Sequence, residues 1–165
     1  MAKIDDINNT AAITRVVNQT LQKGAGQIGA WLEGQIVETI DQQMVIGLGW
    51  PPLAPATVRR KRKKARRAMR NGEKAWVDTG ELRAKIAHQV RRTGGREYTA
   101  FVGVFDEENA LKATWLEFGT ATIPERSLFR KVTARVETRL YDNLETFMAG
   151  AFAQALQETL KRPPS

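Results

Sequence analysis

The sequence contains no cysteine, which excludes disulfide bonds, thiolate metal sites and thiol catalysis. It has a single histidine, His88, and that residue has no motif partner for metal binding or general-base catalysis. Long apolar runs are also missing, because the longest one, residues 147–156, is about half the length that a membrane-spanning helix needs. The first residues carry no apolar signal core, so we expect neither secretion by that route nor a membrane span.

Motifs that carry catalysis are missing as well. The sequence has no phosphate loop, dinucleotide fingerprint, nucleophile elbow or zinc-protease motif. The acidic cluster at residues 106–108 lacks the alternating spacing and the closing glutamate of a calcium loop, and we interpret it as a solvated turn. We therefore expect no catalytic residues, no metal, no cofactor and no enzymatic activity.

Positive charge is concentrated in one segment. The chain has 26 basic and 18 acidic residues, and nine of the basic ones lie between Arg59 and Arg70. Such a cluster binds phosphates, docks an acidic protein, serves as a localisation signal or remains a solvated face. No aromatic residue is interleaved in it, so phosphate contact would not read sequence. The candidate polyanion-binding residues are Arg59, Arg60, Lys61, Arg62, Lys63, Lys64, Arg66, Arg67 and Arg70.

Apolar periodicity predicts two long helices. Apolar residues recur at four-residue spacing from Ile28 to Met44, which predicts a helix from about Ile28 to Val45 whose glycine-containing first half is weak. The same spacing continues through residues 127–161, and a helix of that length is about 50 Å long at 1.5 Å per residue. We expect a helix this long to overhang the domain or to pack on another chain.

The segments between these helices predict shorter elements. Prolines and glycines indicate an ordered loop over residues 47–57, and Asp78 has capping-box spacing to Glu81 at the start of a short helix. Residues 87–93 and 97–105, which contain Val90 and Val102, flank two glycines and predict a β-hairpin. Residues 110–120 fit a helix or a strand equally well.

These elements together predict an α+β fold. We expect a small, mostly antiparallel sheet flanked by an N-terminal helix and a long C-terminal helix. The length of 165 residues favours a single domain, 1–165, with an N-terminal arm at residues 1–12 that leads into a helix, and a basic insert at residues 59–70.

The four tryptophans divide into two pairs. Trp31 and Trp115 lie on patterned elements, and we expect both in the core. Trp50 and Trp76 lie beside loops, where each would either anchor a loop on the domain or bury at a subunit interface.

A series of short motifs between Trp50 and Phe129 contains Trp50, Pro52, Leu53, Pro55, Thr57, Thr79, Gly80, Leu82, Arg83, Glu117, Phe118, Gly119, Thr120, Pro124 and Arg126. This series resembles the tail-component and virion-morphogenesis proteins of tailed bacteriophages, the small neck or tail-completion subunits. A valine-glycine strand at Val102 and Gly103 belongs to the series, and Ser127 departs from it where the family has a second proline. The tyrosine-alanine pair that the family has before its glutamate motif is also absent.

The resemblance implies a structural subunit of the virion that is present in the host cytoplasm during assembly. It implies a homo-oligomeric ring, taken as a hexamer, that joins head to tail among neighbouring neck and tail proteins. Such a ring is a head-to-tail assembly that closes by rotation, and its lumen would pass DNA. The alternative is a freestanding basic protein that binds or processes nucleic acid.

The resemblance also places Glu117, Phe118, Gly119 and Arg126 near one another at the end of the sheet. Gly119 lies between an apolar run and a threonine, and we expect it to take a backbone conformation closed to other residues. Glu117 and Arg126 would either form an ion pair or be two unrelated surface charges.

Overall fold

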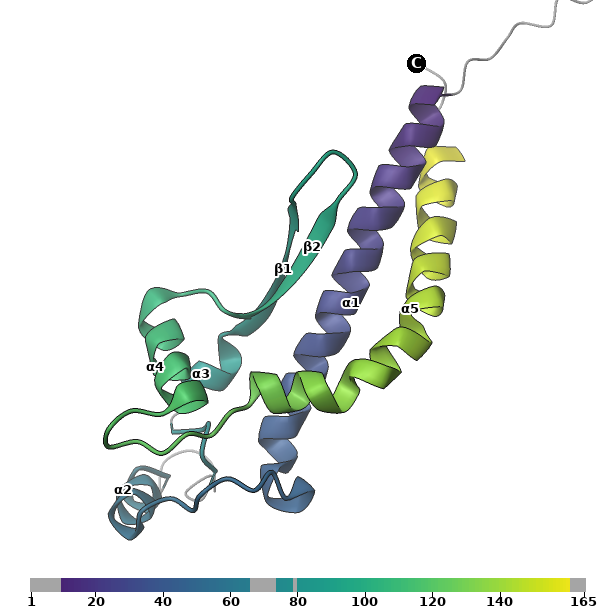
Figure 1. The fold of residues 1–165 in the computed structure, drawn as a ribbon. Coiled ribbons are helices and arrows are strands. Elements are labelled where there is room, and N and C mark those ends of the chain that lie inside the picture. The colour runs from purple at the N-terminus through teal and green to yellow at the C-terminus, as the bar shows by residue number, and fades with distance from the viewer. Residues whose placement is uncertain (1–9, 66–73, 79, 161–165) are drawn as a thin grey trace, which may run out of the picture. The chain divides into compact units, whose positions relative to one another are not determined.

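The computed structural model describes residues 10–65, 74–78 and 80–160. Strands β1 (Ile86–Arg92) and β2 (Tyr98–Val104) pair into a two-stranded antiparallel sheet. The prediction of an α+β fold with an N-terminal helix, a small sheet and a long C-terminal helix is confirmed. In chain order the elements are α1 (Thr10–Ile46), α2 (Pro55–Ala65), α3 (Glu81–Ala84), β1 (Ile86–Arg92), β2 (Tyr98–Val104), α4 (Glu107–Phe118) and α5 (Phe129–Leu160), as Figure 1 shows.

The chain divides into two compact units. The described residues of the first unit lie within 10–29, 89–101 and 139–160. Those of the second unit lie within 30–88 and 102–138. Helices α1 and α5 and the hairpin each contribute residues to both units. The single domain expected from the length stays a prediction.

The second unit contains the apolar core that the periodicity predicts. Ile36 and Ile40 lie four residues apart on α1, and both are fully buried. Val132 and Val136 have the same spacing on α5 and belong to the same cluster. Burying a side chain of this size stabilises the fold by about 1.5–3 kcal/mol. The other buried members of the core are Trp76, Val77, Ile86, Ala113 and Leu128.

The first unit is held by small residues between two helices. The first half of α1 and the last part of α5 run side by side in Figure 1, and Ala151 and Ala155 of α5 are fully buried. A Cβ atom added at Gly24 would lie 2.6 Å from the sulfur of Met148, so the two helices approach closely here and the flexible Met148 side chain would have to shift. Helix α1 runs through these glycines from Thr10 to Ile46, and the weakness expected of its first half stays a prediction.

Two helices begin earlier than the sequence predicts. Helix α1 starts at Thr10 instead of Ile28, so residues 10–12 of the predicted arm are helical, whereas residues 1–9 lie outside the described part. Helix α2 starts at Pro55, which shortens the loop predicted over residues 47–57. Proline is favourable there because the first turn of a helix does not need its missing N–H group.

The hairpin is confirmed, and the ambiguous segment after it is a helix. The observed strands lie within one or two residues of the predicted ones, with the glycine pair in the turn between them. The backbone N–H of Thr93 donates to the carbonyl of Glu97 at 3.0 Å and closes this turn. Residues 107–118 form α4, which places the ambiguous run in a helix.

The predicted helix cap was placed wrongly. Helix α3 begins at Glu81 with Gly80 as its N-cap residue, whereas the expected capping box needs Asp78 at that position. Asp106, which we expected in a solvated turn, is the residue that caps a helix, because its side chain accepts from the backbone N–H of Asn109 at 3.1 Å. This bond lowers the pKa of Asp106.

Only one of the two tryptophans expected in the core packs there. Trp31 is half-buried against the core of the second unit. Trp115 is 42% exposed, so the prediction was wrong for this residue. Helix α4 buries Ala113 and Glu117, which lie four residues apart, and a residue midway between them projects from the opposite face of the helix.

Candidate nucleic-acid interface

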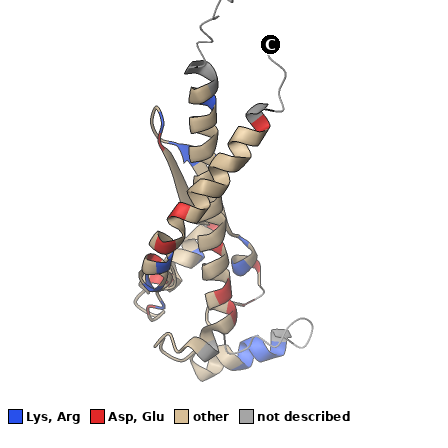
Figure 2. Ribbon diagram, turned by 90° about the vertical axis from the view of Figure 1, so that its right-hand side faces the viewer, with Lys and Arg blue, Asp and Glu red and all other residues tan. Residues whose placement is uncertain are grey.

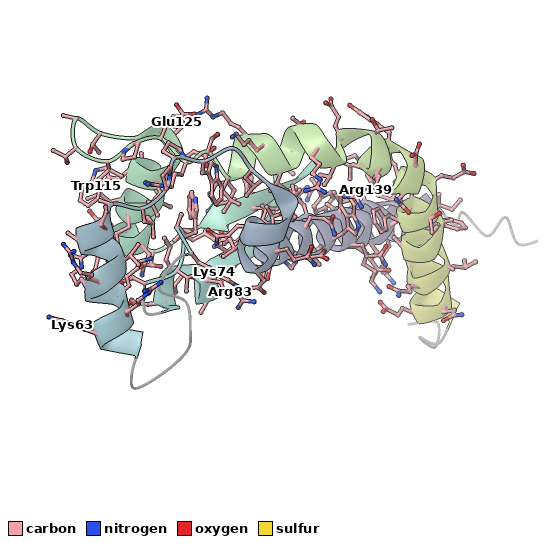
Figure 3. The ribbon with its side chains drawn as sticks, turned by 90° about the horizontal axis from the view of Figure 1, so that it is seen from below. Lys63, Lys74, Arg83, Trp115, Glu125 and Arg139 are labelled. Atoms are coloured by element: carbon pink, nitrogen blue, oxygen red, sulfur yellow. The ribbon has the colours of Figure 1, made fainter. Side chains whose placement is uncertain are left out.

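The basic segment forms helix α2 over its described part. Figure 2 shows α2 as a helix coloured for Lys and Arg, and Figure 3 shows Lys63 pointing outward from it. Four basic side chains of this helix are exposed: Arg59, Arg60, Arg62 and Lys63. Helix α2 contains no acidic residue, so these four cations form one face of uniform sign.

Lys61 differs from its neighbours because it is buried. It is only 6% exposed, and its ammonium group donates to the backbone carbonyls of Lys74 at 2.6 Å and Val77 at 2.5 Å. These bonds fix α2 to the segment that leads into the core. Lys61 is therefore an anchor for the helix, and its assignment to the polyanion-binding set is corrected.

The remaining candidates in the basic run are not placed. Arg66, Arg67 and Arg70 lie outside the described residues, and so does Thr79 of the motif series. Lys64 lies within the range of α2.

The loop before α2 is held by Trp50 and Arg126. The indole N–H of Trp50 donates to the carbonyl of Ser127 at 3.0 Å. The guanidinium of Arg126 donates to the carbonyls of Pro51 and Pro52, both at 3.2 Å. The proline-rich loop is thus tied to the segment that precedes α5, and α2 follows it directly.

Arg126 is buried at 4% exposure, and its burial lowers the pKa of its guanidinium. Its third side-chain bond goes to the carbonyl of Pro124 at 3.3 Å. Its own carbonyl accepts from the indole N–H of Trp76 at 2.9 Å. Of the two readings for Trp50 and Trp76, the structure therefore supports loop anchoring within the chain.

Glu117 caps helix α5. This carboxylate is 5% exposed, and it accepts from the backbone N–H groups of Leu128 at 2.6 Å, Phe129 at 3.1 Å and Arg130 at 3.1 Å. The first N–H groups of a helix lack partners within the helix and carry partial positive charge, so a carboxylate stabilises them. Glu117 and Arg126 thus have other partners, in place of the pair considered from the sequence.

Arg130 is a residue that the motif series did not include. Its guanidinium lies 3.5 Å from the carboxylate of Glu117, and it also pairs with Glu125 at 2.6 Å. It lies over the ring of Phe118, which is 63% exposed, at 5.2 Å. No local pattern marks this role, because the partners come from separate segments of the chain.

Gly119 ends α4 in the conformation that the sequence predicts. Its φ is +77°, and a Cβ atom there would lie 2.9 Å from the backbone nitrogen of Glu125 and 3.0 Å from the carbonyl oxygen of Ile123. Thr120 then closes a tight loop, because its N–H donates to the carbonyl of Ile123 at 2.7 Å. The motif residues therefore meet at the C-terminal end of α4. The resemblance implied that they meet at the end of the sheet, and this expectation was wrong.

Arg83, another motif residue, pairs with Asp41 of α1. Its guanidinium donates to the two carboxylate oxygens of Asp41 at 2.8 and 2.5 Å, and these bonds lower the pKa of that carboxyl. Lys74 donates to the backbone carbonyl of Asp41 at 2.7 Å, and Figure 3 shows Lys74 and Arg83 close together. Leu82 packs against the core next to this pair.

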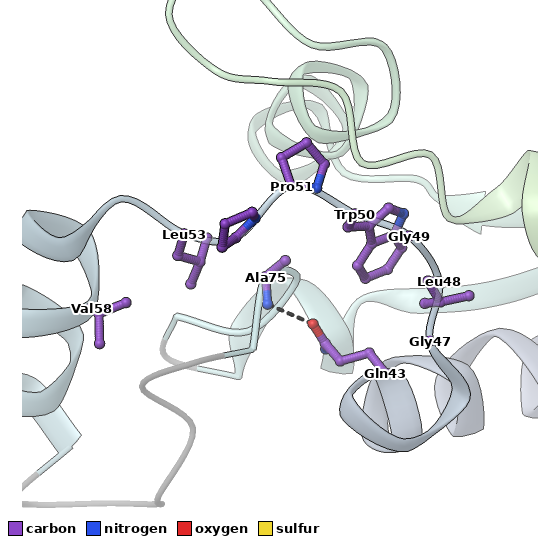
Figure 4. Close-up of a pocket in the computed structure, with 10 residues that line it drawn as sticks. Gln43, Gly47, Leu48, Gly49, Trp50, Pro51, Leu53, Val58 and Ala75 are labelled. Atoms are coloured by element: carbon purple, nitrogen blue, oxygen red, sulfur yellow. Dashed lines mark hydrogen bonds between the residues drawn. The ribbon is translucent and has the colours of Figure 1, made fainter.

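Two cavities flank the proline-rich loop. The first, of about 430 Å³, lies under Trp50 and Leu53, and Figure 4 shows Gln43 accepting the backbone N–H of Ala75 at 2.6 Å beside it. The second, of about 440 Å³, lies between α2 and α4 and is lined by Arg60. Neither cavity contains a histidine.

The described part of the chain contains no group of three acidic or histidine side chains that could hold a metal ion. His88 lies with its Nδ1 atom 2.7 Å from a carboxylate oxygen of Glu33. Within the same residues, no helix has the length and apolarity that are needed to cross a membrane. The site presents the exposed cations of α2 on a helix that Lys61 anchors to backbone carbonyls.

Comparison of the chain with protein families, curated proteins and solved structures finds no match.

Proposed function

We propose that this protein is a structural subunit of a bacteriophage neck or tail-completion ring that joins head to tail. In this proposal α2 contacts the phosphates of the DNA in the lumen of the ring and does not read sequence. The subunit performs no reaction. Its role is to form the ring with other copies of the chain and to present positive charge to the DNA in the lumen.

The main support for the DNA contact is that the basic residues of α2 differ in burial and in role. The buried ammonium group of Lys61 donates hydrogen bonds to two backbone carbonyls, while Arg59, Arg60, Arg62 and Lys63 remain exposed. A cationic helix fixed at one buried point can bind phosphates without a large loss of conformational freedom. The ring itself is supported by the motif series from Trp50 to Arg126, several members of which tie the proline-rich loop and the start of α5 together.

A freestanding nucleic-acid-binding protein is the second candidate, because the same exposed cations support it. Presence in purified virions separates the two. Mass spectrometry of complete particles should find the chain at a stoichiometry that fits a ring. Absence from complete particles, together with DNA binding in solution, would favour the freestanding protein.

The DNA contact is tested by the salt dependence of binding. Fluorescence anisotropy of a labelled duplex is measured with the full chain from about 50 to about 200 mM salt. The variant Arg59→Gln/Arg60→Gln/Arg62→Gln/Lys63→Gln should flatten the plot of log affinity against log salt by roughly 3 to 4 units, because each phosphate contact contributes about 0.9. Unrelated duplexes should bind the unmodified protein with similar affinity.

The matched control removes the same charge elsewhere, with Lys85→Gln, Lys131→Gln, Arg135→Gln and Arg139→Gln. These residues are exposed and lie outside α2. If the control flattens the slope as much as the α2 variant does, α2 is not the DNA contact. If the α2 variant keeps its slope and fails to assemble into a ring, α2 docks an acidic protein surface.

A further inference from the structure

The end of the β1–β2 hairpin carries a second concentration of positive charge. Residues 89–101 contain Arg91, Arg92 and Arg96 against a single acidic residue, Glu97. All three arginines are exposed, and within the described part of the chain none of them forms an ion pair with a carboxylate. In Figure 2 the end of the hairpin shows blue segments.

Two of these arginines are held in place by the hairpin itself. Arg91 donates to the side-chain oxygen of Gln89 at 2.9 Å and lies over the ring of Phe101 at 5.4 Å. Arg92 donates through Nε to the carbonyl of Gly94 at 3.0 Å and through Nη2 to the carbonyl of Gly95. The guanidinium groups therefore lose little conformational freedom when they bind an anion, and their remaining N–H groups are available.

The two faces of the hairpin have different surroundings. Val90 faces α1, because its methyl group lies 3.9 Å from the position of a Cβ at Gly26. Since side chains alternate along a strand, Arg91 lies on the opposite face, together with the half-exposed Phe101. This outer face carries charge and hydroxyl groups, including the contact between Thr93 and Thr99 at 3.1 Å.

We propose that the end of this hairpin binds duplex DNA through its phosphates. A two-stranded ribbon fits the major groove, and arginines on such a ribbon reach the flanking phosphates. An acidic protein is the weaker candidate because a stable protein interface needs a buried apolar centre. Phe101 is the one large apolar side chain that the described residues of this face expose. The inference deepens the proposed function, since it adds a second DNA contact, but it does not depend on α2.

The first test is again the salt dependence of duplex binding. The variant Arg91→Gln/Arg92→Gln/Arg96→Gln should lower the affinity and flatten the salt slope by roughly 2 to 3 units. The control Lys85→Gln/Arg135→Gln/Arg139→Gln removes the same charge from other exposed positions and should leave the slope near that of the unmodified protein. Since Arg92 also holds the turn, Arg91→Gln/Arg96→Gln is measured too and should flatten the slope by about 2 units. Equal slopes for the hairpin variants and the control would overturn the inference.

The second test locates the contact directly. Because the chain has no cysteine, an introduced cysteine is the only one that can be labelled. A Cβ added at Gly95 meets no atom within 4 Å, so Gly95→Cys introduces a unique attachment point for a photo-crosslinker at the hairpin turn. Crosslinking to labelled duplex is expected from this position and not from Thr133→Cys, an exposed position on α5. No crosslink from the turn under conditions where the protein binds DNA would also overturn the inference.

The experiments can contradict the α2 contact and the hairpin contact independently of each other. If the α2 variant flattens the slope and the hairpin variants do not, the proposed function keeps its DNA contact and the hairpin inference is wrong. If only the hairpin variants flatten the slope, the hairpin binds DNA and the α2 contact is wrong. Polyglutamate and unlabelled duplex are also compared, at the same concentration of charge, as competitors of the labelled duplex. If polyglutamate competes as well as the unlabelled duplex does, the partner of the hairpin is an acidic protein.

Discussion

Glu117 shows how one buried carboxylate determines where a helix begins. Its two oxygens accept hydrogen bonds from three backbone N–H groups at the start of α5. A carboxylate suits this position because both of its oxygens are acceptors, and hydrogen bonds to a charged group are stronger than those between neutral groups.

We expect Glu117→Gln to destabilise the protein by about 1–3 kcal/mol, because the amide nitrogen would face backbone donors and leave at least one N–H unsatisfied. Urea unfolding measures the change. Glu125→Gln is the control, since its pair with Arg130 is exposed and should contribute less than about 1 kcal/mol. Equal losses for the two variants would argue against the capping role.

Gly119 is the second position where one residue determines the local backbone. A side chain there meets backbone atoms of Glu125 and Ile123, and those atoms cannot move aside as a flexible side chain would. We expect Gly119→Val to destabilise by more than about 1 kcal/mol, from strain at positive φ together with this clash. The control is Gly103→Ala, where an added Cβ meets nothing within 4 Å and φ is not positive. Thermal unfolding compares the two, and a smaller loss at Gly119 would contradict the argument.

At the scale of elements, α2 shows that a run of similar cations can have two roles. Repulsion among like charges three and four residues apart disfavours a helix by about 0.2–0.5 kcal/mol per pair. The bonds of Lys61 to the carbonyls of Lys74 and Val77 oppose this repulsion by holding the helix against the core segment.

We therefore expect Lys61→Met and Arg62→Met to have opposite profiles. Lys61→Met leaves two carbonyls without their donor and should cost about 1–3 kcal/mol of stability. Arg62→Met should cost less stability than Lys61→Met, because Arg62 is exposed, and it should lower the salt slope of DNA binding by about 1 unit. Urea unfolding and anisotropy on both variants check this. A stable Lys61→Met protein with a lowered slope would show that Lys61 also faces DNA.

For the whole molecule, the exposed apolar side chains of α5 are the feature that a ring would use. Tyr141, Phe152 and Leu156 are exposed on the same helix within the first unit. An isolated exposed apolar residue is common, whereas several on one helix are typical of protein–protein interfaces. This agrees with the expectation that so long a helix packs on a neighbour.

We expect the purified protein to form a closed ring, a hexamer by native mass spectrometry, and Phe152→Glu to shift it to smaller species. The reason is that a charge placed in an apolar interface loses its hydration without gaining a partner. Arg135→Glu, on an exposed position of the same helix in the other unit, is the control for charge alone. A monomer at every concentration, with the chain also absent from virions, would contradict the ring.

The sequence by itself determined the elements whose signal is local. Four-residue apolar spacing located the cores of α1 and α5, with Ile36, Ile40 and Val132 as predicted, because a helix repeats every 3.6 residues. The hairpin followed from β-branched and aromatic residues around a glycine pair, and the conformation of Gly119 followed from its neighbours. In each case the deciding residues are within a few positions of one another.

The tertiary structure alone decided the roles that depend on distant partners. The sequence does not show that Lys61 and Arg62 have different roles, because both are basic residues of the same run. Lys61 is an anchor because its ammonium group meets the carbonyls of Lys74 and Val77. Glu117 meets N–H groups that lie 11 to 13 residues away, and Arg126 meets carbonyls more than 70 residues away. A hydrogen bond requires two groups within about 3 Å, and sequence spacing sets such distances only within a single helix, strand or turn.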